Sequence, residues 1–363
     1  MPSNTSGIAA QAANEVGAGR GHYHALVWRR QLILAAMAIA LLACLCVDLA
    51  LGPSNYALAD VVKAFYAPEE VSVQIRVVLW EIRMPIALMA IVVGAALSVA
   101  GAQMQTILNN PLASPFTLGI SAGASFGAAL ALAFGVALFP FVGALDYLVP
   151  INAFIVAMLT AGLIHLVSMR RGVSVQTIVL LGIALVFCFN ALLALVQFFA
   201  SQQAMAAVVF WTMGSLTKAT WPKFWITLAI LLAVMPIFVK RAWALTAMRL
   251  GDAKAESFGV NISRIRLETL LLVSLLAAIP VSFVGTIGFV GLVGPHIARM
   301  LIGEDQRFFM PAAALCGALL LSASSIVSKM LIPGTIFPIG VVTSLVGIPF
   351  FVSLILSNQK RPW

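Results

Sequence analysis

Long uninterrupted apolar segments are the feature of this sequence that most restricts its fold. They recur along the chain, and each is about 20 residues long, the length that a helix needs to cross a bilayer. Only 9% of the 363 residues are charged, against about 25% in a soluble domain. The apolar runs are continuous rather than alternating, which excludes an outer-membrane barrel. The sequence therefore predicts an all-α polytopic membrane protein.

The apolar segments can be counted along the chain. Eight are clear, and they fall at about 31–51, 84–107, 118–139, 149–169, 177–200, 224–239, 309–328 and 336–357. A further stretch between Glu268 and Arg299 carries no charge and is long for one span. Gly285 and Gly288 permit a tight turn inside it, so we expect two packed helices there. The total of about ten spans puts both ends of the chain on one side of the membrane.

Charge distribution gives the orientation. Residues 1–27 are polar and rich in Gly and Ala, which predicts a disordered tail. Residues 28–357 are expected to form one transmembrane domain, followed by a short tail at 358–363. Fifteen of the 21 Lys and Arg residues lie on the side that carries both ends, and the positive-inside rule makes that side cytoplasmic. Topology thus explains the basic balance, and no nucleic-acid partner is needed.

Missing chemistry limits the possible functions. The predicted spans hold no Asp, Glu, Lys or Arg near their centres, whereas carriers coupled to protons or sodium usually need such groups. The chain has no Gly-rich phosphate loop of an ATPase and no polar set suited to membrane catalysis. We expect no catalytic residues, no metal site and no cofactor in this chain. It either conducts passively or takes its energy from another subunit.

The longest polar loop, at 240–266, is predicted to face the cytoplasm. Within it, the pair Gly251-Asp252 supplies a helix start and Gly259 a stop, which predicts a short helix over about 248–260. Apolar Leu250 and Phe258 could insert into the groove of a partner protein. An amphipathic connector lying on the bilayer surface is an equal alternative.

Three segments follow one another in a distinctive order. The first contains Arg83-Met84-Pro85, Gly101-Ala102-Gln103-Met104-Gln105 and Asn109-Asn110-Pro111. The second is the loop from Leu250-Gly251-Asp252 to Gly259. The third is Gly288-Phe289-Val290-Gly291-Leu292-Val293-Gly294-Pro295-His296-Ile297-Ala298-Arg299. Over about residues 30–357, their order and spacing resemble the FecCD family, the permeases of ABC importers for iron chelates and cobalamin.

The resemblance implies a cobalamin-importer-permease-like fold of the type II ABC importers. It also implies a homodimer with a central pathway, two cytoplasmic ATPase subunits that bind ATP and Mg, and a periplasmic binding protein. The location would be the bacterial inner membrane, with both termini cytoplasmic. A ferric siderophore is the expected cargo, and haem or cobalamin is the alternative within the family. An ATP-independent secondary carrier is the alternative from a different class.

The resemblance also implies roles for particular residues. The helix that couples to the ATPase would contain Leu250, Gly251, Asp252, Ala255, Glu256, Phe258 and Gly259. Docking of the binding protein would fall to Arg83 and Lys329, for which snorkelling at the membrane interface is the alternative. A cytoplasmic gate would contain Val173, Ser174, Val175 and Gln176, for which an ordinary loop is the alternative.

Several polar groups remain as candidates for the pathway. The segment Asn109, Asn110 and Pro111 is expected to form a bend beside it, or else a helix cap with turn chemistry. Gln103, Gln105, Asn190 and Gln197 are candidate pathway amides, and interhelical hydrogen bonds are the alternative. The family motif residues Gly291, Pro295, His296 and Arg299 are expected to be structural, with His296 capping backbone groups.

Overall fold

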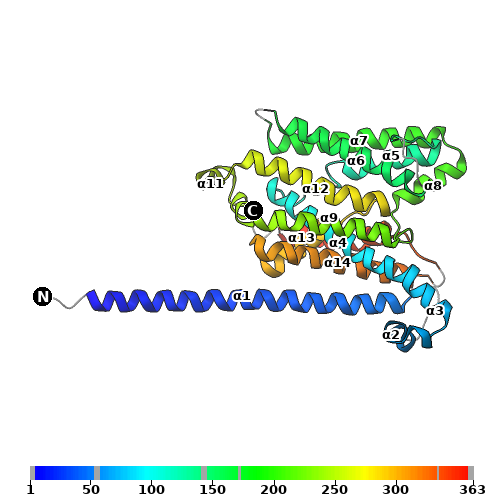
Figure 1. The fold of residues 1–363 in the computed structure, drawn as a ribbon. Helices are drawn as coiled ribbons and strands as arrows, with labels where there is room; N and C mark the ends of the chain where they lie inside the picture. The colour runs from blue at the N-terminus through cyan, green and yellow to red at the C-terminus, as the bar shows by residue number, and fades with distance from the viewer. Residues whose placement is uncertain (1–4, 53–57, 140–144, 171–172, 333–334, 359–363) are drawn as a thin grey trace.

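The computed structural model describes residues 5–52, 58–139, 145–170, 173–332 and 335–358 (Figure 1). Within these residues every regular element is a helix, and seven helices are long and apolar enough to cross a membrane. The seven are α1 (Thr5–Ala50), α4 (Met84–Ile107, preceded without a break by α3, Val73–Val77, and η2, Val78–Arg83), α6 (Leu148–Ser168), α7 (Val175–Phe199), α9 (Trp221–Lys240), α12 (Ile262–Val284) and α14 (Gln306–Met330). Three further apolar helices are α5 (Ile120–Phe134), α13 (Val290–Ile302) and α15 (Ile339–Asn358). These ten helices confirm the predicted all-α polytopic fold.

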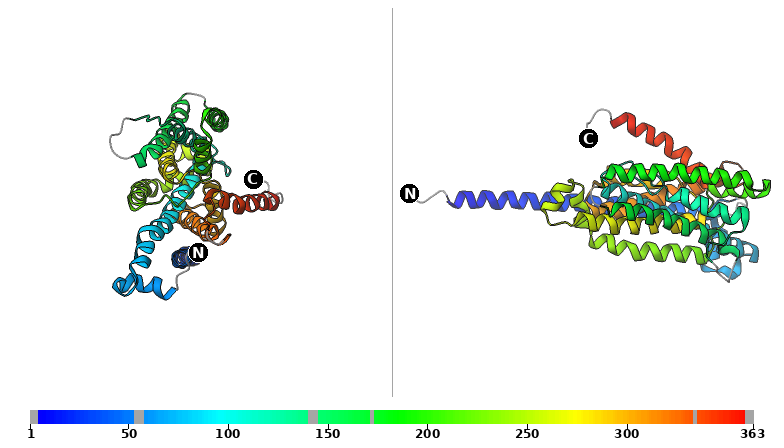
Figure 2. Two further views of the ribbon diagram at one scale, coloured as in Figure 1. Left: turned by 90° about the vertical axis from the view of Figure 1, so that its right-hand side faces the viewer. Right: turned by 90° about the horizontal axis from the view of Figure 1, so that it is seen from above.

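The remaining helices connect the bundle at its two ends. One end carries α2 (Leu58–Tyr66), η1 (Pro68–Glu70) and α8 (Gln202–Thr212), and we call it the α2 end. The short helix η3 (Leu145–Tyr147) leads into α6. The opposite end carries α10 (Ala242–Met248) and α11 (Asp252–Ser257), and is called the α11 end. Helix α1 begins and α15 ends on the α11 side (Figures 1 and 2). This arrangement agrees with an even number of crossings.

The start of the first helix differs from the sequence-based prediction. Helix α1 begins at Thr5, so residues 5–27 are helical rather than a disordered tail. The segment is rich in Ala, the residue with the highest helix propensity. Extending an existing membrane helix also needs no new nucleation, the costly step in forming a helix. The helix therefore continues beyond the part from Tyr23 that is apolar enough to span a membrane.

The uncharged stretch between Glu268 and Arg299 forms two helices, as predicted. Helix α12 ends at Val284, and Gly285 follows it with a φ of 77° that an L side chain rarely adopts. Both α12 and α13 pack against α4. Helix α13 has 13 residues, or about 20 Å at 1.5 Å per residue, and is too short to cross a bilayer alone.

Helix α4 is the centre of the bundle (Figure 2, left view). It packs against α14, α12, α13 and α9, and nearly all of its side chains are buried. A Cβ placed on Gly94 would overlap the carbonyl oxygen of Gly317 in α14, and one on Gly101 would overlap that of Gly291 in α13. Small residues at these crossings allow the backbones to touch, which is the usual way helices pack in membranes.

Other helices are peripheral. Most of the apolar surface of α1 and α7 is uncovered in a single chain. Helix α15 leans away from the bundle (Figure 2, right view). Its main helix contacts are with α13 and α14, and the N–H groups of Ile339 and Gly340 donate to the carbonyl oxygens of Gly214 and Met213. These surfaces are suited to contact with lipid or with a second protein chain.

Candidate functional site

The α11 end presents a short helix that protrudes from the bundle (Figure 1). The helix, Asp252–Ser257, is shorter than the predicted 248–260 but lies within it, with Gly251 before it and Gly259 after it, both at positive φ. Of the helix itself only Ala255 is buried, while Asp252 and Glu256 are exposed. Ala255 thus packs the helix against the rest of the chain, and most of the helix surface is exposed.

Three large apolar side chains surround α11. Leu250 is 56% exposed and Phe258 is 55% exposed, although neither lies in a predicted span. Trp243 is 65% exposed, and its ring centroid lies 6.5 Å from that of Phe258. We call these three residues the α11 apolar patch. Trp243 was not among the residues predicted from the sequence. It could have been found as a tryptophan that closely follows Lys240 and Arg241, at the polar end of an apolar segment.

Asp252 already has a partner within the chain. Both of its carboxylate oxygens accept from Arg266 Nη2 at 3.0 Å, and Arg266 Nε donates to the carbonyl oxygen of Ile107 at 3.0 Å. Arg266 therefore joins the first residue of α11 to the last residue of α4. In this state Arg266 therefore occupies the Asp252 carboxylate, and a contact of Asp252 with an ATPase stays a prediction.

A second set of polar contacts joins the same loop to the bundle. Arg249, at the end of α10, pairs with Glu304 and donates to Asn109 Oδ1 at 3.3 Å. Glu304 also pairs with Arg299 Nε at 3.1 Å, and Arg299 Nη2 donates to Gln105 Oε1 at 3.0 Å. These five residues, called the coupling network below, link the loop before α11 to α4, to α13 and to the start of α14.

The two glutamines of α4 are buried rather than exposed to a pathway. Gln103 Nε2 donates to Gln306 Oε1 at 3.0 Å, and Gln306 Nε2 donates to Thr106 Oγ1 at 2.9 Å. Gln105 is held by Arg299 in the coupling network. In this state both glutamines make the interhelical hydrogen bonds that were the alternative to a pathway role.

The bend after α4 is built by turn chemistry. Asn109 has a φ of 42°, which asparagine tolerates better than most residues. Asn110 Oδ1 accepts from the backbone N–H of Leu112 at 2.9 Å, and the half-buried Pro111 lies between them. On α7, Asn190 is exposed and Gln197 is half-buried, so their pathway role stays a prediction.

The predicted gate segment leads into α7. The Ser174 hydroxyl oxygen accepts from the backbone N–H of Thr177 at 3.2 Å and caps the helix. Val173 and Val175 are half-buried, and Gln176 is exposed. A constriction would need a second chain, so the gate remains a prediction; residues 171–172 lie outside the described residues.

The predicted docking cations are both buried at the α2 end. Arg83 Nη1 donates to the carbonyl oxygens of Leu49 and Ala50 at 2.8 and 2.9 Å, and so caps α1. Helix termini leave carbonyls without partners, which accounts for this position of the guanidinium group. The buried guanidinium does not snorkel to the membrane interface in this state, and a docking role of Arg83 stays a prediction.

Lys329 is likewise held inside the protein. Its Nζ lies 2.9 Å from Asp48 Oδ1, and Ser325 Oγ donates to the same carboxylate at 3.1 Å. Asp48 is fully buried, and a buried carboxylate requires a cation and hydrogen-bond donors. The sequence placed Asp48 in the first span and Lys329 in the ninth, and no local pattern connects positions 281 residues apart.

The motif residues of α13 take part in helix packing, and Arg299 also belongs to the coupling network. Gly291 contacts the backbone of α4 at Leu97, and Pro295 is buried. The His296 ring lies edge-on to Phe350 of α15, with centroids 6.3 Å apart. The side chain therefore packs against an aromatic ring, which differs from the predicted role of capping backbone groups.

This arrangement of helices agrees with comparisons to known proteins. The model of the FecCD transport family matches residues 40–357. The chain belongs to the FecCD transport family, and is thus a membrane permease.

Relatives within the family carry several different names. A protein of Helicobacter pylori named as an iron chelatin transport system permease is 36% identical, with 81% of this chain and 87% of that protein covered. The hemin transport system permease protein HmuU of Yersinia pestis is 35% identical, with 77% and 83% covered. The vitamin B12 import system permease protein BtuC of Vibrio cholerae is 34% identical, with 77% and 83% covered.

A solved structure extends the comparison to the fold. The structure of an inward-facing metal-chelate type ABC transporter superposes with a TM-score of 0.78 at 28% identity. The match covers 90% of this chain and 99% of that chain.

Proposed function

We propose that this chain is the membrane-spanning subunit of an ATP-driven importer for a ferric siderophore. The cargo passes from the periplasm to the cytoplasm by alternating access in a homodimer. ATP and Mg bind to two separate cytoplasmic ATPase subunits, and a periplasmic binding protein delivers the cargo. The observation that carries the proposal is the protruding helix α11, with its exposed apolar patch and its polar connections to α4.

The contacts of α11 suggest how movement of an ATPase reaches the pathway. An ATPase that binds the α11 apolar patch and then moves would displace the segment that contains Arg249 and Asp252. Arg266 transmits this movement to the end of α4, and the Arg249–Glu304–Arg299 chain transmits it to α13 and α14. Salt bridges and hydrogen bonds with two discrete arrangements are typical elements of such transitions.

The basic residues at the α11 end indicate how the protein is oriented in the membrane. Among the described residues, Arg241, Arg249, Arg264, Arg266, Arg299 and Arg307 all lie near the α11 end. The positive-inside rule then makes this end cytoplasmic, where an ATPase is available. With this orientation both termini are cytoplasmic, and the location in the proposal is the inner membrane of a bacterium.

The nature of the cargo rests on chemistry and on relatives. A chelate already surrounds its metal, so the permease needs no metal ligands of its own. Weak contacts along the pathway also favour release, because a cargo that binds tightly cannot leave. Relatives named for iron chelatin, hemin and vitamin B12 keep haem and cobalamin as alternatives to a siderophore.

Uptake of radiolabelled iron tests the proposal. A strain lacking the gene is compared with the same strain carrying the restored gene, using several ferric siderophores, haem and labelled cobalamin, with ATP supply intact or depleted. Restored uptake of one siderophore that requires ATP supports the proposal. Restoration of haem or cobalamin uptake alone would show that the cargo is wrong. Uptake that survives ATP depletion would favour an ATP-independent carrier.

A further inference from the structure

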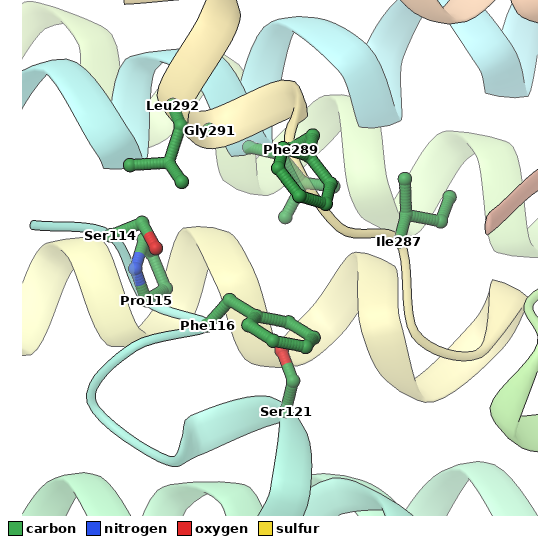
Figure 3. A pocket seen from close by; sticks show the side chains of 9 residues that line it. Ser114, Pro115, Phe116, Ser121, Ile287, Phe289, Gly291 and Leu292 are labelled. Carbon is green, nitrogen blue, oxygen red and sulfur yellow. The ribbon is translucent and has the colours of Figure 1, made fainter. Parts of the chain in front are cut away.

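Two of the apolar helices begin inside the bundle rather than at its surface. Helices α5 and α13 have 15 and 13 residues, or about 22 and 20 Å, and neither crosses a bilayer of about 30 Å. Each follows a residue at positive φ, Gly119 at 83° and Phe289 at 66°. The first turns of both helices line one pocket, together with the segment that holds Ser114 and Phe116 (Figure 3).

The two helix starts give this pocket a positive electrostatic potential. The first N–H groups of a helix have no partner within the helix, and the helix dipole adds about half a positive charge there. Neither Gly119 nor Phe289 supplies a side-chain cap. No Asp, Glu, Lys or Arg is among the described residues that line the pocket, so no side-chain charge offsets the two dipoles.

Ser121 gives independent evidence for a ligand. Its side chain is only 4% exposed and points toward the pocket from the first turn of α5 (Figure 3). Among the described residues its hydroxyl has no hydrogen-bond partner, whereas Ser125, one turn later, donates to the Ser121 carbonyl oxygen at 3.0 Å. A polar side chain that is almost wholly buried and makes no hydrogen bond is uncommon in proteins.

The two helix starts that line the pocket lie next to α7 and α15. Gly119 packs against Gly182 and Leu185 of α7, and Gly347 of α15 packs against Phe289. Counting about 1.5 Å per residue, Leu97 lies about 15 Å from the α11 end of α4, well inside the membrane-spanning part. Discontinuous helices whose N-termini face anionic groups at this depth are a feature of transporter binding sites.

We propose that this pocket is a subsite that binds, transiently during transport, an anionic oxygen group of the chelate, such as a carboxylate. The inference rests on the proposed function. The group accepts hydrogen bonds from the Ser121 hydroxyl, from the first N–H groups of α5 and from the Gly291 N–H of α13. The Val290 and Leu292 N–H groups already donate to the carbonyl oxygens of Gly288 and Phe289. Without a full positive charge the site holds an anion weakly, which orients the cargo and still releases it.

Thiol chemistry tests the positive potential without knowledge of the cargo. The full chain is placed in proteoliposomes with Cys44, Cys46, Cys188 and Cys316 replaced by Ala. Ser121→Cys is then treated with an anionic and a cationic methanethiosulfonate reagent, and each rate is divided by that of free cysteine. We expect the anionic reagent to be favoured by at least about tenfold at Ser121→Cys and not at Ser125→Cys. Equal ratios, or no reaction at Ser121→Cys, would overturn the proposal.

Protection of the same thiol distinguishes the cargo from a free anion. The chelate identified by the uptake experiment should slow the reaction of Ser121→Cys by at least about threefold, and acetate at the same concentration should not. Protection by acetate alone would overturn the assignment to cargo.

Transport provides the last comparison. Ser121→Ala should lower ATP-driven uptake at low chelate concentration by about fivefold and leave the maximal rate nearly unchanged, with Ser125→Ala as the matched control. Equal uptake by the two variants would overturn the subsite. Failure of the wild-type chain to import any chelate would instead refute the proposed function, while the ratio of reagent rates would still report on the pocket.

Discussion

Asp48 and Lys329 illustrate how single residues hold this bundle together. Their ion pair lies between α1 and α14, where water is largely excluded, and Ser325 adds a hydrogen bond to the carboxylate. Removing two charges from water is costly, so such a pair is not a large net source of stability. Breaking it is nevertheless expensive, because one charge then remains buried without a partner.

Replacement of one member of this pair should therefore be far worse than replacement of both. We expect Lys329→Met to lower the free energy of unfolding by about 3–5 kcal/mol. The double variant Asp48→Leu with Lys329→Met should recover most of that loss, because it leaves no buried charge. Thermal unfolding in detergent measures both, with Lys218→Met on the exposed surface as control. Equal losses in the single and double variants would contradict this explanation.

Arg249 makes a different prediction, concerning coupling rather than stability. Arg249→Ala removes the contacts of the loop before α11 with Glu304 and Asn109. In proteoliposomes with the ATPase subunits, we expect ATP hydrolysis to continue while uptake per ATP falls at least about fivefold. Lys240→Ala, an exposed cation at the end of α9, is the control. An unchanged ratio of uptake to hydrolysis would show that the coupling network does not transmit movement.

At the level of the helices, much of the architecture could be predicted from the sequence. Apolar runs located the ten helices, and Gly251 and Gly259 located α11, because hydropathy and glycine backbone freedom are local properties. The partners of Asp252, Gln103 and Lys329 could not be predicted in this way. Those contacts depend on which helices become neighbours, and Asp48 finds Lys329 only after the bundle has formed.

Helix packing around α4 gives a prediction at this level. Gly101→Ala places a methyl group against the carbonyl oxygen of Gly291 and must push α13 away from α4. We expect a loss of about 1–3 kcal/mol in the free energy of unfolding, the usual cost of overpacking. Gly162→Ala in α6 is the matched control, since its added methyl group meets no atom within 4 Å. Similar unfolding temperatures for the two variants would mean that α13 can move without cost.

For the whole molecule, the uncovered faces of α7 and α15 raise the question of what covers them. A homodimer built on these faces would place two copies of α7 near each other, with Asn190 from each chain toward a shared pathway. The pocket between α5 and α13 would then open near that pathway, since α7 and α15 flank it.

Cross-linking tests this assembly. With the native cysteines replaced, Asn190→Cys should form a covalent dimer with a short bifunctional thiol reagent in native membranes. Leu166→Cys, on the exposed surface of α6, should remain a monomer under the same treatment. Dimers from Leu166→Cys and none from Asn190→Cys would place the interface on another face.

The ion pair between Asp48 and Lys329 also has a consequence for biosynthesis. The two residues are 281 positions apart, and a ribosome that adds 5–20 residues per second needs about 15 to 60 s to connect them. During that interval the first span carries a carboxylate whose cation has not yet been made. The first span therefore enters the membrane with Asp48 unpaired. Its ion pair forms only after the ninth span, which leads to Lys329, has been synthesised and inserted.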